Sequence, residues 1–238
     1  MSPSPAATEG AGLVVALPAE AHCVGARGMR AGDCQRWQHG WIAVAGIGPH
    51  NAMRAAERLL ACGVSQLASW GVAGALDAKL APGDVLIPDR VLHALDDPGF
   101  ATDSGLRACL DSALARYLVV RRGTLWSAAR PVTTQAGKQS LAARSGAIAV
   151  DMEAAAVAAV AARARLPFVA LKAICDPATR ELPASIVHAL DVSDGGVSWR
   201  MVAAILTGGP LAWRAARALA HDFACARRSL TTAAALAA

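Results

Sequence analysis

Residues 147–176, AIAVDMEAAAVAAVAARARLPFVALKAICD, decide the fold of this chain. The apolar run at 147–150 predicts a strand, and the alanine-rich run at 151–165 predicts a helix, since alanine has the highest helix propensity. Residues 168–175 are apolar again, as expected for a strand that is buried on both faces. Strands that alternate with helices in this way are typical of α/β folds.

The segments upstream repeat this alternation. Apolar runs predict strands at 12–17, 41–45, 67–70 and 84–88 and within 117–126. Helices are predicted at 49–62, where Pro49 suits the first turn and Gly63 ends the helix, and at 105–117, where Ser104 can act as the cap. Further helices are predicted at 133–144, 198–207 and 210–228.

The order of these elements indicates the architecture. Several strands precede the first long helix of the second half, so the sheet is expected to be mixed. We therefore expect an α/β fold, a single-domain three-layer α/β/α sandwich with a mixed, largely parallel central sheet. The domain is expected to span residues 11–238 and to follow a flexible N-terminal tail at residues 1–10.

The composition excludes several classes of protein. The chain has 238 residues, of which 55% are hydrophobic and 17% charged, and its formal net charge is +5. This length suits one domain, and so many apolar residues with so little charge exclude a disordered chain. No basic run is interleaved with aromatic residues, so nucleic-acid binding is not indicated.

The cysteines and the N-terminal residues bear on metal binding and location. Cysteines occur at positions 23, 34, 62, 109, 175 and 225, without a CxxC pair or a Cys/His spacing that suits zinc. We expect reduced thiols and no metal site. Residues 1–10 lack the features of a signal peptide, and no run reaches the roughly 18 apolar residues that indicate a membrane span. The prediction is a cytoplasmic protein.

Candidate functional residues follow the predicted strands, because ligands of open α/β sheets bind at the carboxyl ends of strands. Each strand end contributes polar or glycine residues, namely Glu20, Gly46 with Gly48, Gly71 with Gly74, Asp151 with Met152 and Glu153, and Asp176. Each also has an ordinary structural explanation: a GxG before a helix makes a tight turn, Glu153 favours a helix dipole, and Asp176–Pro177 is a common turn pair. Their joint placement at one rim favours a functional site.

Two motifs identify a family. AVDMEAAAVA (149–158) followed by ALKAICDPA (170–178) resembles the nucleoside phosphorylase and nucleosidase superfamily, which includes purine nucleoside phosphorylase and methylthioadenosine/S-adenosylhomocysteine nucleosidase. The resemblance continues in GLVVALPAEA (12–21), AGIGPHNAMRAAE (45–57) and WGVAGALDAKLAPGDVLIP (70–88). It implies a nucleoside phosphorylase-like fold and an enzyme that cleaves the N-glycosidic bond of a purine nucleoside.

The C-terminal third is similar to one branch of that family. DPATRELPASIV (176–187), DGGVSW (194–199) and GGPLAWRAARALAHDFACA (208–226) resemble the hopanoid-associated phosphorylases. Enzymes of that branch are thought to release adenine from adenosylhopane, a nucleoside with a triterpenoid at its 5′ carbon. The resemblance therefore implies a 5′-substituted adenosine as substrate.

The same resemblance assigns roles to the candidate residues. Asp176 corresponds to the acid that protonates N7 of the leaving purine, and Glu20 to the carboxylate that activates water in the nucleosidases. Glu153 corresponds to the carboxylate that accepts hydrogen bonds from ribose hydroxyls, and Met152 to the residue that packs against sugar and base. Val132 lies where the nucleosidases hold adenine. The remaining substrate-binding candidates are Asp151, Gly48, Gly71 and Val72.

Departures from the family pattern bear on the nucleophile. Bacterial phosphorylases have an arginine and a serine as phosphate ligands where this chain has Ser69 and Val72. This favours hydrolysis without a cofactor, while Arg27 or Arg30 leaves phosphate open as a co-substrate. Residues 127–132 lack the usual Gly-Asp pair and the aromatic residue that stacks on the base. A phosphate-dependent purine nucleoside phosphorylase, a methylthioadenosine/S-adenosylhomocysteine-type nucleosidase and a non-catalytic nucleoside-binding protein are the alternatives.

Two expectations concern partners. Family members are oligomers, so a homo-oligomer is expected. The predicted C-terminal helix has an apolar stripe, Leu211, Ala215, Leu219 and Phe223, and a basic face, Arg214, Arg217, His221 and Arg228. The stripe is expected to face the core, with the basic face either solvated or in peripheral contact with anionic lipid headgroups at a membrane surface.

Overall fold

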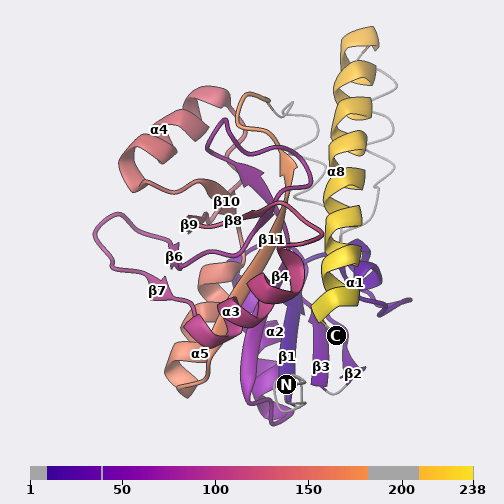
Figure 1. The fold of residues 1–238 in the computed structure, drawn as a ribbon, viewed down its shortest axis with the longest axis vertical. Helices are drawn as coiled ribbons and strands as arrows, with labels where there is room; N and C mark the ends of the chain where they lie inside the picture. Colours follow the sequence, from indigo (N-terminus) through magenta and orange to yellow (C-terminus); the bar gives the residue numbers. More distant parts are fainter. Residues whose placement is uncertain (1–9, 39, 182–208, 238) are drawn as a thin grey trace.

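The computed structural model describes residues 10–38, 40–181 and 209–237, and in the last segment it describes side chains from residue 217 onward (Figure 1). Two long parallel strands form the centre of the sheet, β4 (Gln66–Ala75) and β11 (Phe168–Asp176). β11 is buried along almost its whole length, which requires helices on both faces of the sheet.

The other strands extend the sheet on either side of this pair. β1 (Ala11–Val15) runs parallel to β4 and to β3 (Gly40–Val44), and β2 (Cys34–Trp37) is antiparallel to β3 at the edge. β10 (Ala149–Asp151) is antiparallel to the end of β4 and leads through β9 (Thr124–Ser127) and β6 (Arg90–Leu92) to β7 (Phe100–Ala101). β5 (Val85–Leu86) is antiparallel to β11, and β8 (Val120–Arg121) pairs with β5. The sheet is mixed, as predicted.

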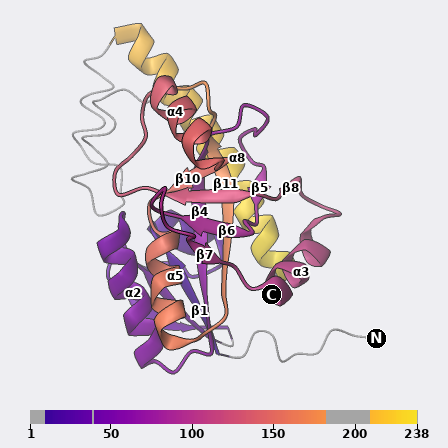
Figure 2. The same cartoon turned by 90° about the vertical axis from the view of Figure 1, so that its left-hand side faces the viewer.

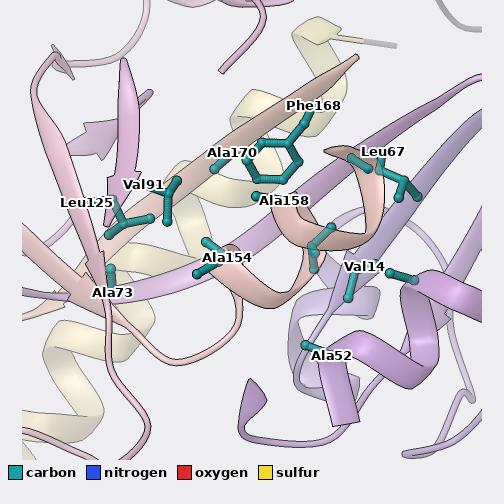
Figure 3. Packing of buried hydrophobic residues seen from close by; sticks show 14 of the residues in the cluster. Val14, Ala52, Leu67, Ala73, Val91, Leu125, Ala154, Ala158, Phe168 and Ala170 are labelled. Atoms are coloured by element: carbon teal, nitrogen blue, oxygen red, sulfur yellow. The ribbon is translucent and has the colours of Figure 1, made fainter. Parts of the chain in front are cut away.

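Two helices cover one face of the sheet. α2 (Pro49–Ala61) and α5 (Ala154–Ala164) lie side by side on it (Figures 1 and 2). Their buried residues are mostly alanines, which allow the helices to approach each other and the sheet closely. These alanines pack with sheet residues such as Val14, Leu67 and Phe168 in one large apolar cluster (Figure 3).

The opposite face is covered by α1 (Pro18–Cys23), α3 (Ser104–Leu114) and α8 (Gly209–Ala237). In Figure 2, α8 and α3 lie on the other side of the sheet from α2 and α5. Leu114 of α3 and Leu230 of α8 pack with Trp70 and Leu171 of the sheet in a second apolar cluster. Helices on both faces make the predicted three-layer α/β/α sandwich.

α4 (Gln135–Ser145) stands apart from these layers, beside the carboxyl ends of the strands (Figure 1). The Thr134 side chain caps its first turn, and Gly146 ends it in the left-handed conformation. Leu141 holds the helix in a small apolar cluster with Leu76 and Val150.

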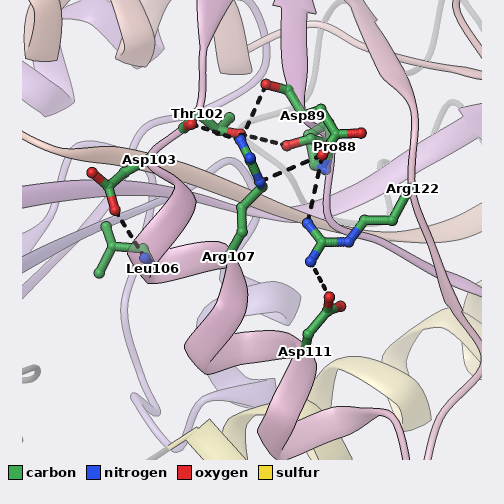
Figure 4. A network of polar contacts seen from close by, with 8 residues as sticks. All are labelled: Pro88, Asp89, Thr102, Asp103, Leu106, Arg107, Asp111 and Arg122. Atoms are coloured by element: carbon green, nitrogen blue, oxygen red, sulfur yellow. Dashed lines mark hydrogen bonds and ion pairs between the residues drawn. The ribbon is translucent and has the colours of Figure 1, made fainter.

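A polar network holds α3 against the sheet (Figure 4). Nη1 of Arg107 donates to the carbonyl and the hydroxyl of Thr102 at 2.7 and 2.8 Å, and the Thr102 hydroxyl donates to the Pro88 carbonyl at 2.6 Å. Arg122 pairs with Asp111 on α3 and with Asp89. The cap of α3 is Asp103, which accepts from the Leu106 amide at 2.9 Å, so the prediction of Ser104 as the cap was wrong.

Several predicted strands differ from the observed ones. The strand predicted within 117–126 is two strands, β8 and β9, because Gly123 at φ +146° redirects the chain from β5 to β10. The third predicted strand does not stop at Trp70, since β4 continues through Gly71 and Gly74 to Ala75, and the expected glycine turn is a strand. The short strands β2, β6 and β7 and the helix α1 were not predicted.

The C-terminal helix also differs from its prediction. α8 extends to Ala237, nine residues beyond the predicted end at 228. Among the side chains of α8 that are described, from residue 217 onward, the buried ones are Asp222, Ala226, Ser229, Leu230 and Ala233, whereas Leu219 and Phe223 are half-buried. Leu219 and Phe223 therefore do not belong to the buried face of the described part of α8, and the side chains of Leu211, Arg214 and Ala215 lie outside the described residues. Arg217, His221 and Arg228 are exposed, while the helix predicted at 198–207 and the tail at 1–9 lie outside the described residues.

Within the described ranges, no helix is both long enough and apolar enough to cross a membrane.

Candidate functional site

Glu20 is a buried carboxylate held by backbone amides. It lies in α1, directly after β1, and is 2% exposed. Its Oε2 accepts hydrogen bonds from the Ala16 and Leu17 amides at 2.8 and 2.9 Å, and Oε1 accepts from the Val72 amide at 2.9 Å. The carboxylate is therefore fixed against β4 at the carboxyl end of the sheet.

Gly71 provides the space that Glu20 occupies. Its φ is +152°, and a Cβ placed on it would lie 2.4 Å from Oε1 of Glu20. No side chain fits at that distance, so residue 71 must be glycine if the carboxylate is to reach the Val72 amide.

Glu153 is the N-cap residue of α5 but does not cap the helix. The first free amides of α5 are satisfied by other groups, since Oδ2 of Asp151 accepts from the Ala154 amide at 3.0 Å and Oγ of Ser127 accepts from the Ala155 amide at 3.2 Å. Oε1 of Glu153 instead accepts from the Gly48 amide at 2.8 Å, and Oε2 accepts from the Met152 amide at 3.2 Å. The helix-dipole explanation of Glu153 is thus insufficient, because its carboxylate faces the start of α2.

A buried lysine connects these carboxylates. Lys172 lies on β11, opposite Gly71 on β4, and is 2% exposed. Its Nζ lies 2.9 Å from Oδ2 of Asp151, and its charge also acts on Glu153 and Glu20. Glu20, Asp151, Glu153 and Lys172 together form what we call the carboxylate cluster.

The charges of the cluster shift one another's pKa values. Burial raises the pKa of Glu20, with Lys172 and the backbone amides opposing it. Burial and the neighbouring Asp151 carboxylate raise the pKa of Glu153 to about 7. Burial alone would lower the pKa of Lys172, but the three carboxylates outweigh burial and raise it, so Lys172 carries its charge at neutral pH. The cluster therefore holds one ammonium among three carboxyl groups, two of which, Glu20 and Glu153, have raised pKa values.

Asp176 lies at the end of β11, on the same strand as Lys172. The register shifts between Ile174 and Asp176, so Cys175 is the extra residue of a β-bulge. Oδ2 of Asp176 pairs with Nζ of Lys138 from α4, and Oδ1 is buried without a hydrogen-bond partner among the described residues. Burial raises the pKa of Asp176, and Lys138 opposes this shift.

The remaining candidates occupy less enclosed positions on the same rim. Met152 and Val72 are half-buried and contribute their amides to Glu153 and Glu20. Val132 is half-buried and packs against the small cluster that contains Val150, next to Asp151. Arg27 and Arg30 are exposed.

Sequence reasoning missed Lys138 and Lys172. Lysine is seldom fully buried, and Lys138 lies in a polar helix where an exposed position is the ordinary expectation. Lys172 had a signal that was not used, since it is the single charged residue within the apolar run 168–175. A lysine inside a buried strand must be paired, which points to nearby carboxylates.

Two other features of the described residues bear on ligand binding. No group of three or more His, Cys, Asp or Glu side chains in them has an arrangement that holds a metal ion. An apolar pocket lined by Leu13, Trp37, Trp70 and Leu110 contains none of the candidate residues and lies toward the amino ends of β1 and β4.

Comparison with known proteins places the chain in a family. The family model described as Phosphorylase superfamily matches residues 37–206. Aminodeoxyfutalosine nucleosidase of Helicobacter pylori is 29% identical over 157 residues, which is 59% of this chain and 68% of that protein.

Solved structures share the fold. 5′-Methylthioadenosine/S-adenosylhomocysteine nucleosidase from Neisseria meningitidis, in complex with methylthio-immucillin-A, has a TM-score of 0.71 at 19% identity and covers 95% of this chain and 97% of its own. Futalosine hydrolase of Helicobacter pylori has a TM-score of 0.66 at 18% identity and covers 94% of this chain and 97% of its own. The family match and the related nucleosidase lead to one conclusion: the chain belongs to the phosphorylase superfamily and is an enzyme that cleaves N-glycosyl bonds.

Proposed function

We propose that this enzyme is a purine nucleosidase that hydrolyses a 5′-substituted adenosine and releases adenine. The carboxylate cluster is the observation that carries the proposal. When the N-glycosidic bond breaks, the ribose becomes an oxocarbenium-like cation and the purine gains negative charge. Buried carboxylates stabilise such a cation, because charges interact strongly where water is excluded, and the developing positive charge in turn favours the ionised forms of Glu153 and Glu20.

Each acidic residue has a role in this reaction. Glu153, fixed by Gly48, accepts hydrogen bonds from the ribose hydroxyls beside Met152. Asp176 donates a proton to N7 of the leaving purine, and such an acid typically contributes about 10²–10⁴-fold to the rate. Glu20 takes a proton from water as the water oxygen bonds to the anomeric carbon. The products are adenine, held near Val132 before release, and the free ribosyl compound.

The same cluster disfavours phosphate as the nucleophile. Its ionised carboxylates repel a phosphate dianion, and Lys172, the cation whose charge acts on Glu20, is already paired with Asp151. The usual phosphate ligands are replaced by Ser69, which is buried, and Val72, whose amide is bonded to Glu20. We therefore propose hydrolysis without a cofactor, with phosphorolysis as the alternative that the experiment tests.

The experiment measures adenine release from adenosylhopane, methylthioadenosine and inosine, each with and without phosphate. We expect adenine and a free ribosyl product in the absence of phosphate. Strict dependence on phosphate, with ribose 1-phosphate as product, contradicts the proposed hydrolysis. No base release from any purine nucleoside favours a non-catalytic binding protein.

Adenosylhopane is the substrate that we propose within this class, which would place the enzyme in hopanoid biosynthesis. The support is the resemblance of residues 176–187, 194–199 and 208–226 to the hopanoid-associated branch. The similarity to nucleosidases for methylthioadenosine and aminodeoxyfutalosine supports a purine nucleoside with a modified 5′ end. A higher kcat/KM for methylthioadenosine than for adenosylhopane contradicts the hopanoid assignment and leaves the nucleosidase assignment intact.

A lipid-bearing substrate suggests contact with a membrane surface. The exposed side chains of Arg217, His221 and Arg228 on α8 provide a basic face, worth about 1 kcal/mol for each basic residue near anionic headgroups. We propose that this face binds anionic vesicles at low salt and that Arg217→Glu with Arg228→Glu abolishes the binding. Wild-type protein that remains in the supernatant with anionic vesicles excludes the contact.

A homo-oligomer in the cytoplasm remains part of the proposal. Its support is analogy with oligomeric family members, so the oligomeric state has to be measured by light scattering during size-exclusion chromatography. A monomeric mass at micromolar concentration contradicts it.

A further inference from the structure

Lys138 is the most deeply buried cation near the proposed acid. Its side chain is 1% exposed, although it lies at the first turn of α4. Neither burial nor this position favours an ammonium group, because burial removes its hydration and the N-terminal end of a helix carries partial positive charge. A strong local interaction must therefore hold it there.

That interaction is with the turn that contains Asp176. The ammonium of Lys138 pairs with Oδ2 of Asp176 and donates to the carbonyls of Pro177 and Arg180 at 2.9 and 3.0 Å. All three contacts are to one short segment, residues 176–180. Lys138 thus fixes both the carboxylate and the backbone that follows it.

The contact leaves the two carboxylate oxygens of Asp176 in different environments. Oδ2 is taken by Lys138, whereas Oδ1 is buried without a hydrogen-bond partner among the described residues. A buried acceptor without a hydrogen bond destabilises the folded protein. Of the two oxygens, Oδ1 therefore gains more from a hydrogen bond to a ligand.

We propose that Lys138 is a positioning residue for Asp176: it holds Oδ2, leaves Oδ1 for the leaving purine, and stabilises the carboxylate that remains once the proton has been donated. The inference rests on the proposed function, in which Asp176 is the acid. The proton moves from Asp176 to N7 of the purine, and the resulting Asp176 anion lies beside the Lys138 cation. Without that cation, a buried Asp176 would release its proton reluctantly.

Two other charged groups, Arg180 and Asp222, act on Asp176. Arg180, in the same turn, acts in the same direction as Lys138, and Asp222 on α8 acts in the opposite direction. Arg180 is itself paired with Asp222, so their effects on Asp176 partly cancel. Burial raises the pKa of the neighbouring Cys175 thiol to about 12, so it adds no charge at neutral pH. Lys138 is therefore the main group among the described residues that opposes the burial of Asp176.

The test compares Lys138→Gln with Lys138→Arg. The glutamine can still donate to the turn carbonyls but carries no charge, while the arginine keeps the charge. The measurement is the alkaline limb of the pH profile of kcat, which reports the proton of the acid. We expect this limb to move to higher pH by about 1–3 units in Lys138→Gln, as for removal of an adjacent opposite charge, and to stay in place in Lys138→Arg.

Asp222→Asn serves as the matched control. It removes the partner of Arg180 and so loosens the same turn, but it also removes a negative charge near Asp176. If the role of Lys138 is purely structural, both Lys138→Gln and Asp222→Asn should have a lower kcat, and the alkaline limb of the pH profile should not move in either variant. An unmoved limb in Lys138→Gln overturns the proposal, and an upward shift in Asp222→Asn also overturns it.

Two further outcomes separate the inference from the function. If Asp176→Asn turns over normally, the proposed acid itself is wrong, whereas an inactive Asp176→Asn with an unmoved limb in Lys138→Gln rejects only the role of Lys138. If Lys138→Gln does not fold, infrared difference spectra of wild type against Asp176→Asn provide the test. An Asp176 band that is protonated at the pH of turnover and becomes ionised as the pH passes through the alkaline limb supports the proposal, and a band that stays protonated above that limb overturns it.

Discussion

The amide of Gly48 donates a 2.8 Å hydrogen bond to Oε1 of Glu153, and this bond joins residues 105 positions apart in the sequence. Gly48 is the N-cap residue of α2 and has a φ of +99°. Glu153 occupies the same position in α5, and α2 and α5 pack against each other on one face of the sheet. The bond therefore ties two helix starts together and orients the carboxylate that we assign to the ribose.

The first prediction concerns substrates that lack the 2′-hydroxyl. Glu153 is held by two amides, and a ribose hydroxyl would add a donor to a buried carboxylate. Loss of such a donor costs about 1–3 kcal/mol, which corresponds to roughly a 5- to 150-fold lower kcat/KM. The measurement is kcat/KM for a ribonucleoside and its 2′-deoxy analogue, and equal values would remove Glu153 from ribose recognition.

The second prediction concerns stability and pH. The folded protein holds the pKa of Glu153 at about 7, above the ordinary value of 4.5 for a glutamate side chain. Between these values the folded state binds more protons than the unfolded state, so the free energy of unfolding falls as pH rises. The full loss above pH 7 is on the order of 3 kcal/mol, at about 1.4 kcal/mol for each pKa unit.

Glu153→Gln should remove this dependence. Urea unfolding of wild type near pH 5 and pH 8 should show lower stability at the higher pH, and the variant should show a smaller difference. The variant should also lose most activity. If the free energy of unfolding of Glu153→Gln decreases between pH 5 and pH 8 as much as that of wild type, another group is responsible for the pH dependence. Glu20, whose pKa is also raised, would be the next candidate.

The third prediction concerns Gly71→Ala. A Cβ at this position would lie 2.4 Å from Oε1 of Glu20, so the carboxylate must leave the Val72 amide. We expect a loss of turnover of about 10²-fold or more, as for removal of a general base. Gly28→Ala is the matched control, because Gly28 also has a positive φ, +75°, but a Cβ there meets nothing within 4 Å.

The control separates strain from displacement. Both substitutions force alanine into a conformation that disfavours a side chain, at a cost of about 1–2 kcal/mol. Gly28→Ala should therefore lower stability and leave kcat near that of wild type. Similar kcat values for the two variants would show that the position of Glu20 does not matter for turnover.

Local sequence patterns predicted the parts of the fold that depend on them. The apolar runs at 12–17 and 168–175 and the alanine-rich helix at 151–165 correspond to β1, β11 and α5, since burial on both faces and helix propensity are local signals. The short strands β2, β6 and β7 were missed because two to four residues carry no period. Their pairing partners, not their own residues, make them strands.

Part of the candidate site could also be predicted from local sequence signals, and part could not. The rule that ligands bind at the carboxyl ends of strands placed Glu20, Glu153 and Asp176 on one rim. The arrangement of their charges depends on tertiary contacts that cross the chain, such as Lys172 with Asp151 and Lys138 with Asp176. The bulge at Cys175, which shifts the register before Asp176, also has no sequence signal of its own.

The last prediction concerns Glu20→Gln. Both oxygens of Glu20 accept backbone amides, two at Oε2 and one at Oε1. A glutamine presents one oxygen and one NH₂ group, so in either orientation an amide donor of the backbone meets another donor. The substitution therefore removes the proposed base and also loses at least one buried hydrogen bond, which costs about 1–3 kcal/mol.

We expect Glu20→Gln to lower kcat for base release by about 10²-fold or more while KM changes little, because the residue acts on water and not on the purine. The exposed Glu57, paired with Arg163 on α5, provides the control, and Glu57→Gln should leave kcat unchanged. The measurements are adenine release at saturating substrate and urea unfolding of both variants. A Glu20→Gln enzyme that is folded and turns over at the wild-type rate would mean that water is activated elsewhere, and phosphate dependence should then be measured again in that variant.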